Sequence, residues 1–111
     1  IDILQPDVTW CGGLTELLRI SSMAAAYDIP VVPHGSGAYS YHFVITQPHC
    51  PFCEYLNTSP DCLSFPSVFG NLFENEILPV NGKIKLNNEP GFGMKLNRKN
   101  LKLNRVFPSN E

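Results

Sequence analysis

The first 56 residues alternate between short apolar runs and stretches with helical periodicity. Three runs have the length of strands: "IDILQP" (1–6), "IPVVPH" (29–34) and "PFCEYL" (51–56). Two candidate helices, 12–28 and 39–47, lie between them. Strands that alternate with helices pair in parallel, and a continuously apolar strand such as 29–34 is typical of a sheet covered on both faces. The alternation therefore predicts an α/β fold.

The first candidate helix has an apolar stripe that ends in small side chains, formed by Leu14, Leu17, Leu18, Ser21 and Ala25. Small residues allow a helix to lie close to a sheet. Asp28 and Pro30 end this helix, and Pro48 ends the second one.

The composition changes after residue 56. Residues 57–67 have the composition of a loop, and "SVFGNLF" (67–73) predicts a helical turn. The remaining chain predicts short extended segments separated by Asn-Gly and Pro-Gly turns. We therefore expect an α/β unit in residues 1–66 and a C-terminal segment, 67–111, that packs on it as a cap.

Composition excludes several classes of protein. There is no run of 18 apolar residues, so a membrane-spanning helix is not expected. The net charge of −2 gives no general attraction to nucleic acid or to acidic lipid. Residues 83–111 are rich in Lys and Arg, but these alternate with apolar residues, as on a solvated sheet face. The chain begins at Ile1 without the basic region of a signal peptide, and we expect a piece of a longer cytoplasmic protein.

The cysteines raise the question of a redox or zinc site. Cys50-Pro-Phe-Cys53 has the spacing of a redox pair or of half a zinc site, with His49 and Cys62 nearby. A thioredoxin-like pair begins a helix, whereas this pair enters a candidate strand, and the second close pair of a structural zinc site is missing. We expect free thiols and keep redox and zinc chemistry as alternatives.

Three ionisable residues lie at intervals that each correspond to about one strand plus one helix. Asp7 follows the first candidate strand, His34 ends the second, and Glu54 lies in the third. The carboxyl ends of parallel strands meet at one edge, which holds the active site in β/α barrels. An aspartate beside a histidine is a general-base arrangement, and Gly35 and Gly37 allow a tight turn beside a ligand. Spacing alone leaves open that His34 is a hydrogen-bonded turn residue and that Asp7 caps a loop.

The stretches "ILQPDVTWCGGLTELLRISSMA", "VVPHGSGAYSYHF" and "PFCEYL", in this order, resemble the C-terminal part of the enolase superfamily. More narrowly, they resemble the mandelate-racemase-type acid-sugar dehydratases, and the L-rhamnonate dehydratases most of all. The closing "PVNGKIKLNNEPGFGMKLN" is similar to the C-terminal segment of that family. The resemblance implies the C-terminal part of a (β/α) TIM-type barrel, with about strands 6–8 in residues 1–66, followed by the capping segment.

The resemblance also implies roles for the three ionisable residues. His34 corresponds to the general acid/base, Asp7 to its dyad partner, and Glu54 to the acid that hydrogen-bonds the substrate carboxylate and its enediolate. The implied reaction is β-elimination of water from an acid sugar to give a 2-keto-3-deoxy acid, and the family stabilises the enediolate with Mg²⁺. The implied partner is a small acid-sugar substrate, not nucleic acid or membrane, and full-length members are expected to be homo-oligomers.

The metal ligands of that family come from earlier strands. Asp2 lies within a strand, Glu16 on a helix and Asp28 at a helix end, so they are not expected to replace those ligands. We expect no metal site in this chain and no turnover by the chain alone. A different acid sugar, or a fold fragment that serves as a non-catalytic interaction protein, remain the alternatives.

Residues beside the three ionisable groups are further candidates for substrate contact. Trp10 follows Asp7 closely, with packing as the alternative role, and Ser36 and Tyr39 follow His34. His42 lies on the second candidate helix, where we expect a hydrogen-bonded structural residue.

Overall fold

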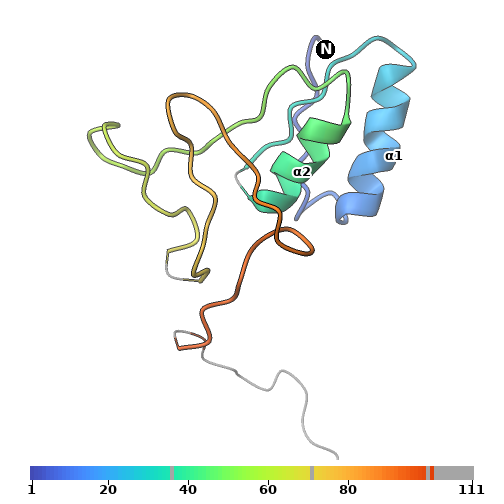
Figure 1. Cartoon of the computed structure of the whole chain (residues 1–111). Coiled ribbons are helices and arrows are strands. Elements are labelled where there is room, and N and C mark those ends of the chain that lie inside the picture. Colours follow the sequence, from blue (N-terminus) through green and yellow to red (C-terminus); the bar gives the residue numbers. More distant parts are fainter. Residues whose placement is uncertain (36, 71, 100, 102–111) are drawn as a thin grey trace, which may run out of the picture.

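The structure, a computed structural model, describes residues 1–35, 37–70, 72–99 and 101. These residues contain two helices, α1 (Leu14–Ala25) and α2 (Ala38–Thr46), and four isolated β-bridges. Figure 1 shows the two helices side by side, with the chain after residue 50 running as coil. Within the described ranges, neither helix has the length and apolar character needed to cross a membrane.

The two segments 1–6 and 29–34 pair in parallel, as predicted. Leu4 bridges Val31 and Asp7 bridges His34, both with the same offset of 27 residues. The His34 N–H donates to the Pro6 carbonyl at 3.0 Å, which continues the ladder. The pairing is present as two separate bridges and not as continuous strands.

The predicted third strand, 51–56, is not found: the structure assigns neither strand nor bridge to these residues. Val31 still donates its N–H to the His49 carbonyl at 3.3 Å, so the chain enters this region beside the second segment. Pro48 and Pro51 have no N–H to donate, which limits the hydrogen bonds available for a ladder.

Helix α1 is shorter than the predicted 12–28. It begins after Gly13, whose φ of 96° is unfavourable for any residue with a side chain. It ends at Ala25, and Asp28 adopts a left-handed φ of 54° that a helix cannot continue. The predicted 39–47 helix is shifted by one residue, to Ala38–Thr46.

The main core lies between the parallel segments and the two helices. It consists of Val8, Leu17, Ala24, Val31 and Phe43, all nearly inaccessible to solvent. Ser21 is also buried on α1, and its hydroxyl lies 2.9 Å from Nε2 of His49. This contact joins α1 to the loop before Cys50, so His49 has a structural partner.

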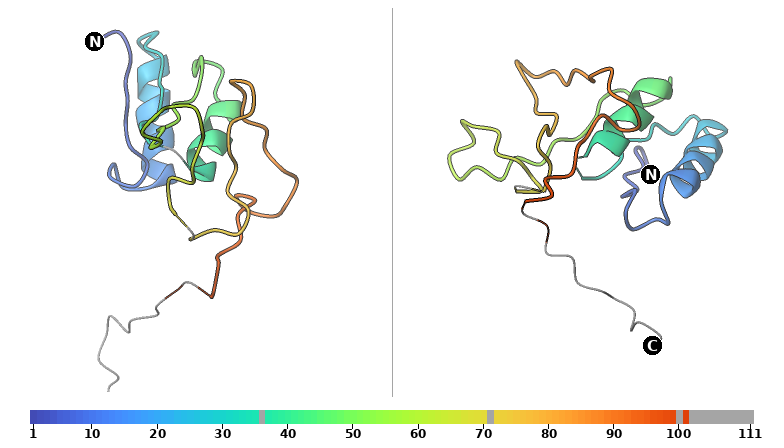
Figure 2. Two further views of the ribbon diagram at one scale, coloured as in Figure 1. Left: turned by 90° about the vertical axis from the view of Figure 1, so that its left-hand side faces the viewer. Right: turned by 60° about the horizontal axis from the view of Figure 1, so that its bottom comes forward.

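A second cluster joins α2 to the C-terminal half of the chain. Ala38 and Tyr41 of α2 pack with Ile77, and partly buried apolar residues surround them: Cys53, Tyr55, Ile84, Leu86 and Met94. Figure 2 shows the later part of the chain passing beside α2 in both views. These contacts bring Ile77, Ile84, Leu86 and Met94 against α2. The division into an α/β unit, 1–66, and a capping segment, 67–111, stays a prediction. Where a helical turn was predicted, the described residues 67–70, 72 and 73 have hydrogen-bonded turns and no assigned helix: Gly70 donates its N–H to the Ser67 carbonyl at 3.4 Å, and Leu72 to the Phe69 carbonyl at 3.3 Å.

The predicted Asn-Gly turn is confirmed at residues 81 and 82. Asn81 and Gly82 both have left-handed backbones, with φ of 50° and 70°. Val80 and Lys83 exchange both N–H···O=C hydrogen bonds, at 2.8 and 3.0 Å. Two positive φ values and this reciprocal pair are the signature of a type I′ hairpin turn.

The Gly82→Ala variant is expected to open this turn, because a left-handed conformation costs a residue with a Cβ about 1–2 kcal/mol. Amide hydrogen exchange at Lys83 should therefore accelerate by roughly fivefold to thirtyfold. Asn88→Ala, at an exposed position outside the turn, is the control and should leave that exchange rate unchanged. An unchanged rate in Gly82→Ala would contradict the turn assignment.

Candidate active site

Asp7 and His34 lie opposite each other on the paired segments. In a parallel bridge the two opposed side chains project to the same face, and neighbouring strands are about 4.8 Å apart. Both residues stand at the carboxyl end of their segment, before the chain turns toward a helix. The structure thus brings these two predicted groups together at one edge.

Glu54 joins them through the imidazole of His34. Its Oε2 lies 2.8 Å from His34 Nδ1 and accepts the N–H of Gly35 at 2.7 Å. Its Oε1 accepts a longer hydrogen bond, 3.5 Å, from the Gln5 side chain. The His34 side chain is 50% exposed and that of Glu54 is 26% exposed. With Nδ1 turned to Glu54, Nε2 is the ring nitrogen that can exchange a proton with a ligand.

Asp7 makes its hydrogen bonds with its own loop. Its Oδ1 accepts both the backbone N–H of Thr9 at 2.7 Å and the Thr9 hydroxyl at 2.5 Å. Burial acts to raise the pKa of Asp7, but the hydrogen bonds from Thr9 and Trp10 and the nearby His34 imidazole outweigh it and lower that pKa. The carboxylate is therefore held in its ionised form.

Among the described residues, the two members of the implied dyad, Asp7 and His34, do not form a hydrogen bond with each other. The loop after Asp7 folds back on itself, since Cys11 donates its N–H to the Asp7 carbonyl at 2.8 Å. This places the Thr9 donors beside Oδ1, while Glu54 takes the Nδ1 position of the imidazole. Asp7 and His34 interact through charge across the edge rather than through a shared proton.

Positions 35 and 37 favour glycine for different reasons. The φ of 83° at Gly35 favours glycine, and a Cβ at this position would lie 3.4 Å from Asp7 Oδ2. Gly37 serves differently: its backbone is extended, but a Cβ there would meet the Tyr39 ring at 2.9 Å. Gly35 is thus required for its backbone conformation, since a Cβ at 3.4 Å would make only an ordinary contact, whereas Gly37 leaves room for the Tyr39 ring.

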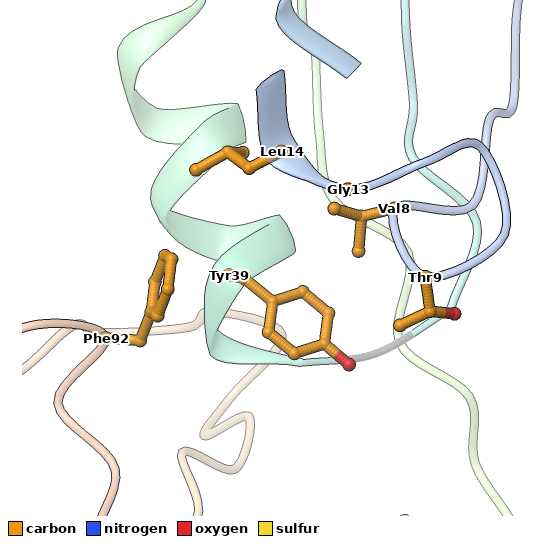
Figure 3. Close-up of a pocket in the computed structure, with 6 residues that line it drawn as sticks. All are labelled: Val8, Thr9, Gly13, Leu14, Tyr39 and Phe92. Carbon is orange, nitrogen blue, oxygen red and sulfur yellow. The ribbon is translucent and has the colours of Figure 1, made fainter. Parts of the chain in front are cut away.

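An apolar hollow of about 380 Å³ lies next to Asp7, between the starts of α1 and α2. Figure 3 shows the six side chains and backbone positions that line it: Val8, Thr9, Gly13, Leu14, Tyr39 and Phe92. The Tyr39 ring meets Phe92 edge-on, with centroids 6.1 Å apart. Burial, and secondly the charge of Asp7, raise the pKa of the Tyr39 hydroxyl, which places this candidate for substrate contact near the acidic group.

The other candidates for substrate contact have different outcomes. Trp10 is 88% exposed, so the alternative packing role is not found. Ser36 lies outside the described residues. His42 was expected to be hydrogen-bonded, but its Nε2 is buried without a partner in the described chain. Its ring instead packs edge-on against Phe92, with centroids 5.7 Å apart, and a phenyl ring offers no conventional hydrogen-bond acceptor.

The described residues do not form a metal site, because no three of their His, Cys, Asp or Glu side chains are arranged so that they could hold a metal ion. The donor set at the edge, one imidazole already paired with one carboxylate, does not fit a Mg²⁺ ion, which prefers several oxygen ligands. The four cysteines are free thiols. Burial raises the pKa of Cys50 and of Cys53, opposite to the lowered pKa of a reactive redox pair.

Sequence reasoning missed Thr9 and Gln5. The pattern Asp7-Val8-Thr9 carries a signal for the first, because an aspartate often accepts hydrogen bonds from the residue two positions later. Nothing in the sequence indicates the contact between Gln5 and Glu54, which are 49 residues apart.

Comparisons with known proteins identify the family and the fold of the chain. A family model described as "Enolase C-terminal domain-like" matches residues 1–100. The L-rhamnonate dehydratase of Saccharopolyspora erythraea is 51% identical over 96 residues, which are 86% of this chain and 25% of that enzyme. A crystal structure of L-rhamnonate dehydratase from Gibberella zeae superposes with a TM-score of 0.81 at 55% identity, over 89% of this chain and 26% of that chain.

A second structure of the Gibberella zeae enzyme, complexed with Mg, gives a TM-score of 0.78 at 55% identity, over 89% of this chain and 25% of that chain. The chain therefore spans about a quarter of the length of these relatives. The family match and the structural likeness confirm the resemblance to the enolase superfamily and identify an α/β fragment of that fold. The chain belongs to the enolase C-terminal domain-like family.

Proposed function

We propose that this chain is the C-terminal part of the β/α barrel of an acid-sugar dehydratase, contributing about strands 6–8 and a capping segment. Its role in catalysis is to supply the acid/base group for β-elimination of water from an acid sugar. The observation that carries the proposal is the convergence of Asp7, His34 and Glu54 at the end of one parallel pair. L-rhamnonate is the favoured substrate, since the relatives at about half identity are L-rhamnonate dehydratases.

In the proposed reaction, Nε2 of His34 removes the proton α to the substrate carboxylate. This proton is weakly acidic, so the base must be positioned and its new charge must be stabilised. Glu54 at 2.8 Å and the ionised Asp7 both favour the imidazolium that forms. The electrons of the broken C–H bond delocalise into the carboxylate and then expel the 3-hydroxyl.

The same imidazolium returns its proton to the leaving hydroxyl, which departs as water. The resulting enol rearranges to the 2-keto-3-deoxy acid, so the balance is one acid sugar to one keto acid and one water. An imidazole has an ordinary pKa of about 6.5, which suits a group that must accept and return a proton near neutral pH. Among the described side chains at this edge, His34 is the one that is both half-exposed and able to accept and return a proton near neutral pH.

Glu54 has two possible partners in this proposal. By resemblance it contacts the substrate carboxylate, and in the structure it holds the His34 ring and the Gly35 N–H. Its Oε1, which accepts only a 3.5 Å hydrogen bond from Gln5, is the oxygen placed to meet a ligand. The Mg²⁺ of the Gibberella zeae complex would be held by residues outside this chain, and no step above depends on residues here binding it.

Reconstitution tests the proposal. The 111-residue chain is co-expressed with the three quarters of the Gibberella zeae enzyme that this chain does not match, and formation of a 2-keto-3-deoxy acid from L-rhamnonate is measured with Mg²⁺ present. We expect turnover by the two pieces together and none by either piece alone. A panel of other acid sugars measures specificity. A complex that assembles by gel filtration but turns over no acid sugar would favour the non-catalytic alternative.

A further inference from the structure

Thr9 gives both of its donors to one oxygen of Asp7. The backbone N–H reaches Oδ1 at 2.7 Å and the side-chain hydroxyl reaches the same oxygen at 2.5 Å. The Thr9 side chain is exposed, whereas the preceding Val8 is 5% exposed and belongs to the main core. Thr9 therefore adds little to packing, and its polar contacts are directed to the carboxylate.

Two donors on one oxygen determine how the carboxylate group is oriented. A carboxylate rotates easily about its last side-chain bond, and this terminal torsion has only broad preferences. With Oδ1 anchored to Thr9, Oδ2 faces the backbone of Gly35, 3.4 Å from the position a Cβ would take. Oδ2 is thereby presented to the segment that carries His34.

We propose that Thr9 is a positioning residue, whose hydroxyl and amide fix the Asp7 carboxylate so that Oδ2 lies toward Gly35, the residue next to the general base His34. Its catalytic consequence rests on the proposed function, whereas the fixing of Asp7 is a property of the chain itself. Thr9 touches neither the reacting atoms nor the imidazole in this arrangement and acts only through Asp7.

Removing the Thr9 hydroxyl is expected to raise the pKa of Asp7. Hydrogen bonds to the ionised carboxylate lower the pKa of Asp7, so their loss raises it. Two titratable groups from other elements face this carboxylate, His34 from the paired segment and Tyr39 from α2. Both are retained in a Thr9 variant. The loss of the hydroxyl therefore determines the direction in which the pKa of Asp7 changes.

The first experiment follows the Asp7 carboxyl carbon by NMR during a pH titration of the full 111-residue chain. Thr9→Val keeps the amide and the branched shape but lacks the hydroxyl, and Asp7 should titrate at higher pH. Thr9→Ser keeps the hydroxyl and should titrate as the parent chain does. Thr15→Val, on the exposed side of α1, is the matched control and should leave Asp7 unchanged. An unchanged Asp7 titration in folded Thr9→Val, or in Thr9→Ala if the valine variant does not fold, overturns the proposal.

The second experiment measures the pH–rate profile of the reconstituted complex. Thr9→Val should lower kcat about tenfold, equivalent to about 1.4 kcal/mol, with KM unchanged, because the variant loses one hydrogen bond to a charged group. The acid limb should move to higher pH, since a raised pKa neutralises Asp7 earlier as pH falls. Thr9→Ser should restore the parent profile.

The two experiments separate the two claims. If Asp7 titrates as expected but the parent complex is inactive, the proposed function fails and the fixing of Asp7 by Thr9 stands. If the parent complex is active and Thr9→Val has the parent rate and profile, the positioning role is overturned while the proposed function stands.

Discussion

The His34→Asn variant is expected to lose about a hundredfold to ten-thousandfold of the dehydration rate in the reconstituted complex, the usual contribution of a general acid/base. Asparagine can still hydrogen-bond to Glu54 but cannot accept and return a proton. Proton exchange separates this loss from a binding defect: the α-hydrogen of L-rhamnonate should exchange with solvent deuterium in the parent complex and not in the variant. Rates are measured at saturating substrate so that kcat is compared directly.

The control is a second histidine outside the edge. His49 bonds to Ser21 through Nε2 at 2.9 Å, and in His49→Gln the side-chain amide can still reach the Ser21 hydroxyl. We expect this variant to keep the parent rate. A His34→Asn complex that retains more than a tenth of the parent kcat would remove His34 from the role of general base.

The Leu17→Ala variant is expected to lose about 2–5 kcal/mol of unfolding free energy, the cost of truncating a fully buried leucine. Leu17 is 0% exposed and lies in the main core between α1 and the parallel segments. Domains have only about 5–15 kcal/mol of stability in total, so this loss is a large fraction for any short chain. Urea unfolding followed by circular dichroism measures the change.

The adjacent residue provides the control on the same helix. Leu18 is 42% exposed, and Leu18→Ala should change the unfolding free energy by no more than about 0.5 kcal/mol. Alanine also favours the helix slightly more than leucine does, so both variants share the same small helix-propensity term. Equal losses in the two variants would show that the structure has the wrong face of α1 in the core.

Several parts of this fold could be predicted because they depend on local chemistry. The turn at Asn81 and Gly82 follows from two residues that tolerate left-handed conformations. The predicted stripe of α1 is confirmed at Leu17 and Ser21, but Leu18 and Ala25 are exposed and Ala24 is buried instead. The ends of the helix depended on the backbone angles of Gly13 and Asp28, which no periodic pattern reveals. The parallel pairing of 1–6 with 29–34 followed from the alternation of strand and helix.

The contacts within the candidate site were harder to predict. Spacing placed Asp7, His34 and Glu54 at one edge, but it did not determine which carboxylate would hold the imidazole. That outcome depends on the loop after Asp7, where Thr9 occupies Oδ1, and on the Gly35 backbone, which shares Glu54 Oε2 with the imidazole. Sequence spacing does not indicate which of several acceptors, only a few ångströms apart, will take a given hydrogen-bond donor.

The shared offset of the two bridges has an evolutionary consequence. Because Asp7 and His34 are aligned by the pairing of their segments, the length of chain between them does not itself set their separation. Homologues can gain or lose residues in the turn after α1 and still keep the two groups opposed. A single-residue deletion between Leu4 and Asp7 would instead turn the Asp7 carboxylate to the reverse side of the sheet. Insertions and deletions among homologues should therefore be frequent in the turn after α1 and rare between Leu4 and Asp7.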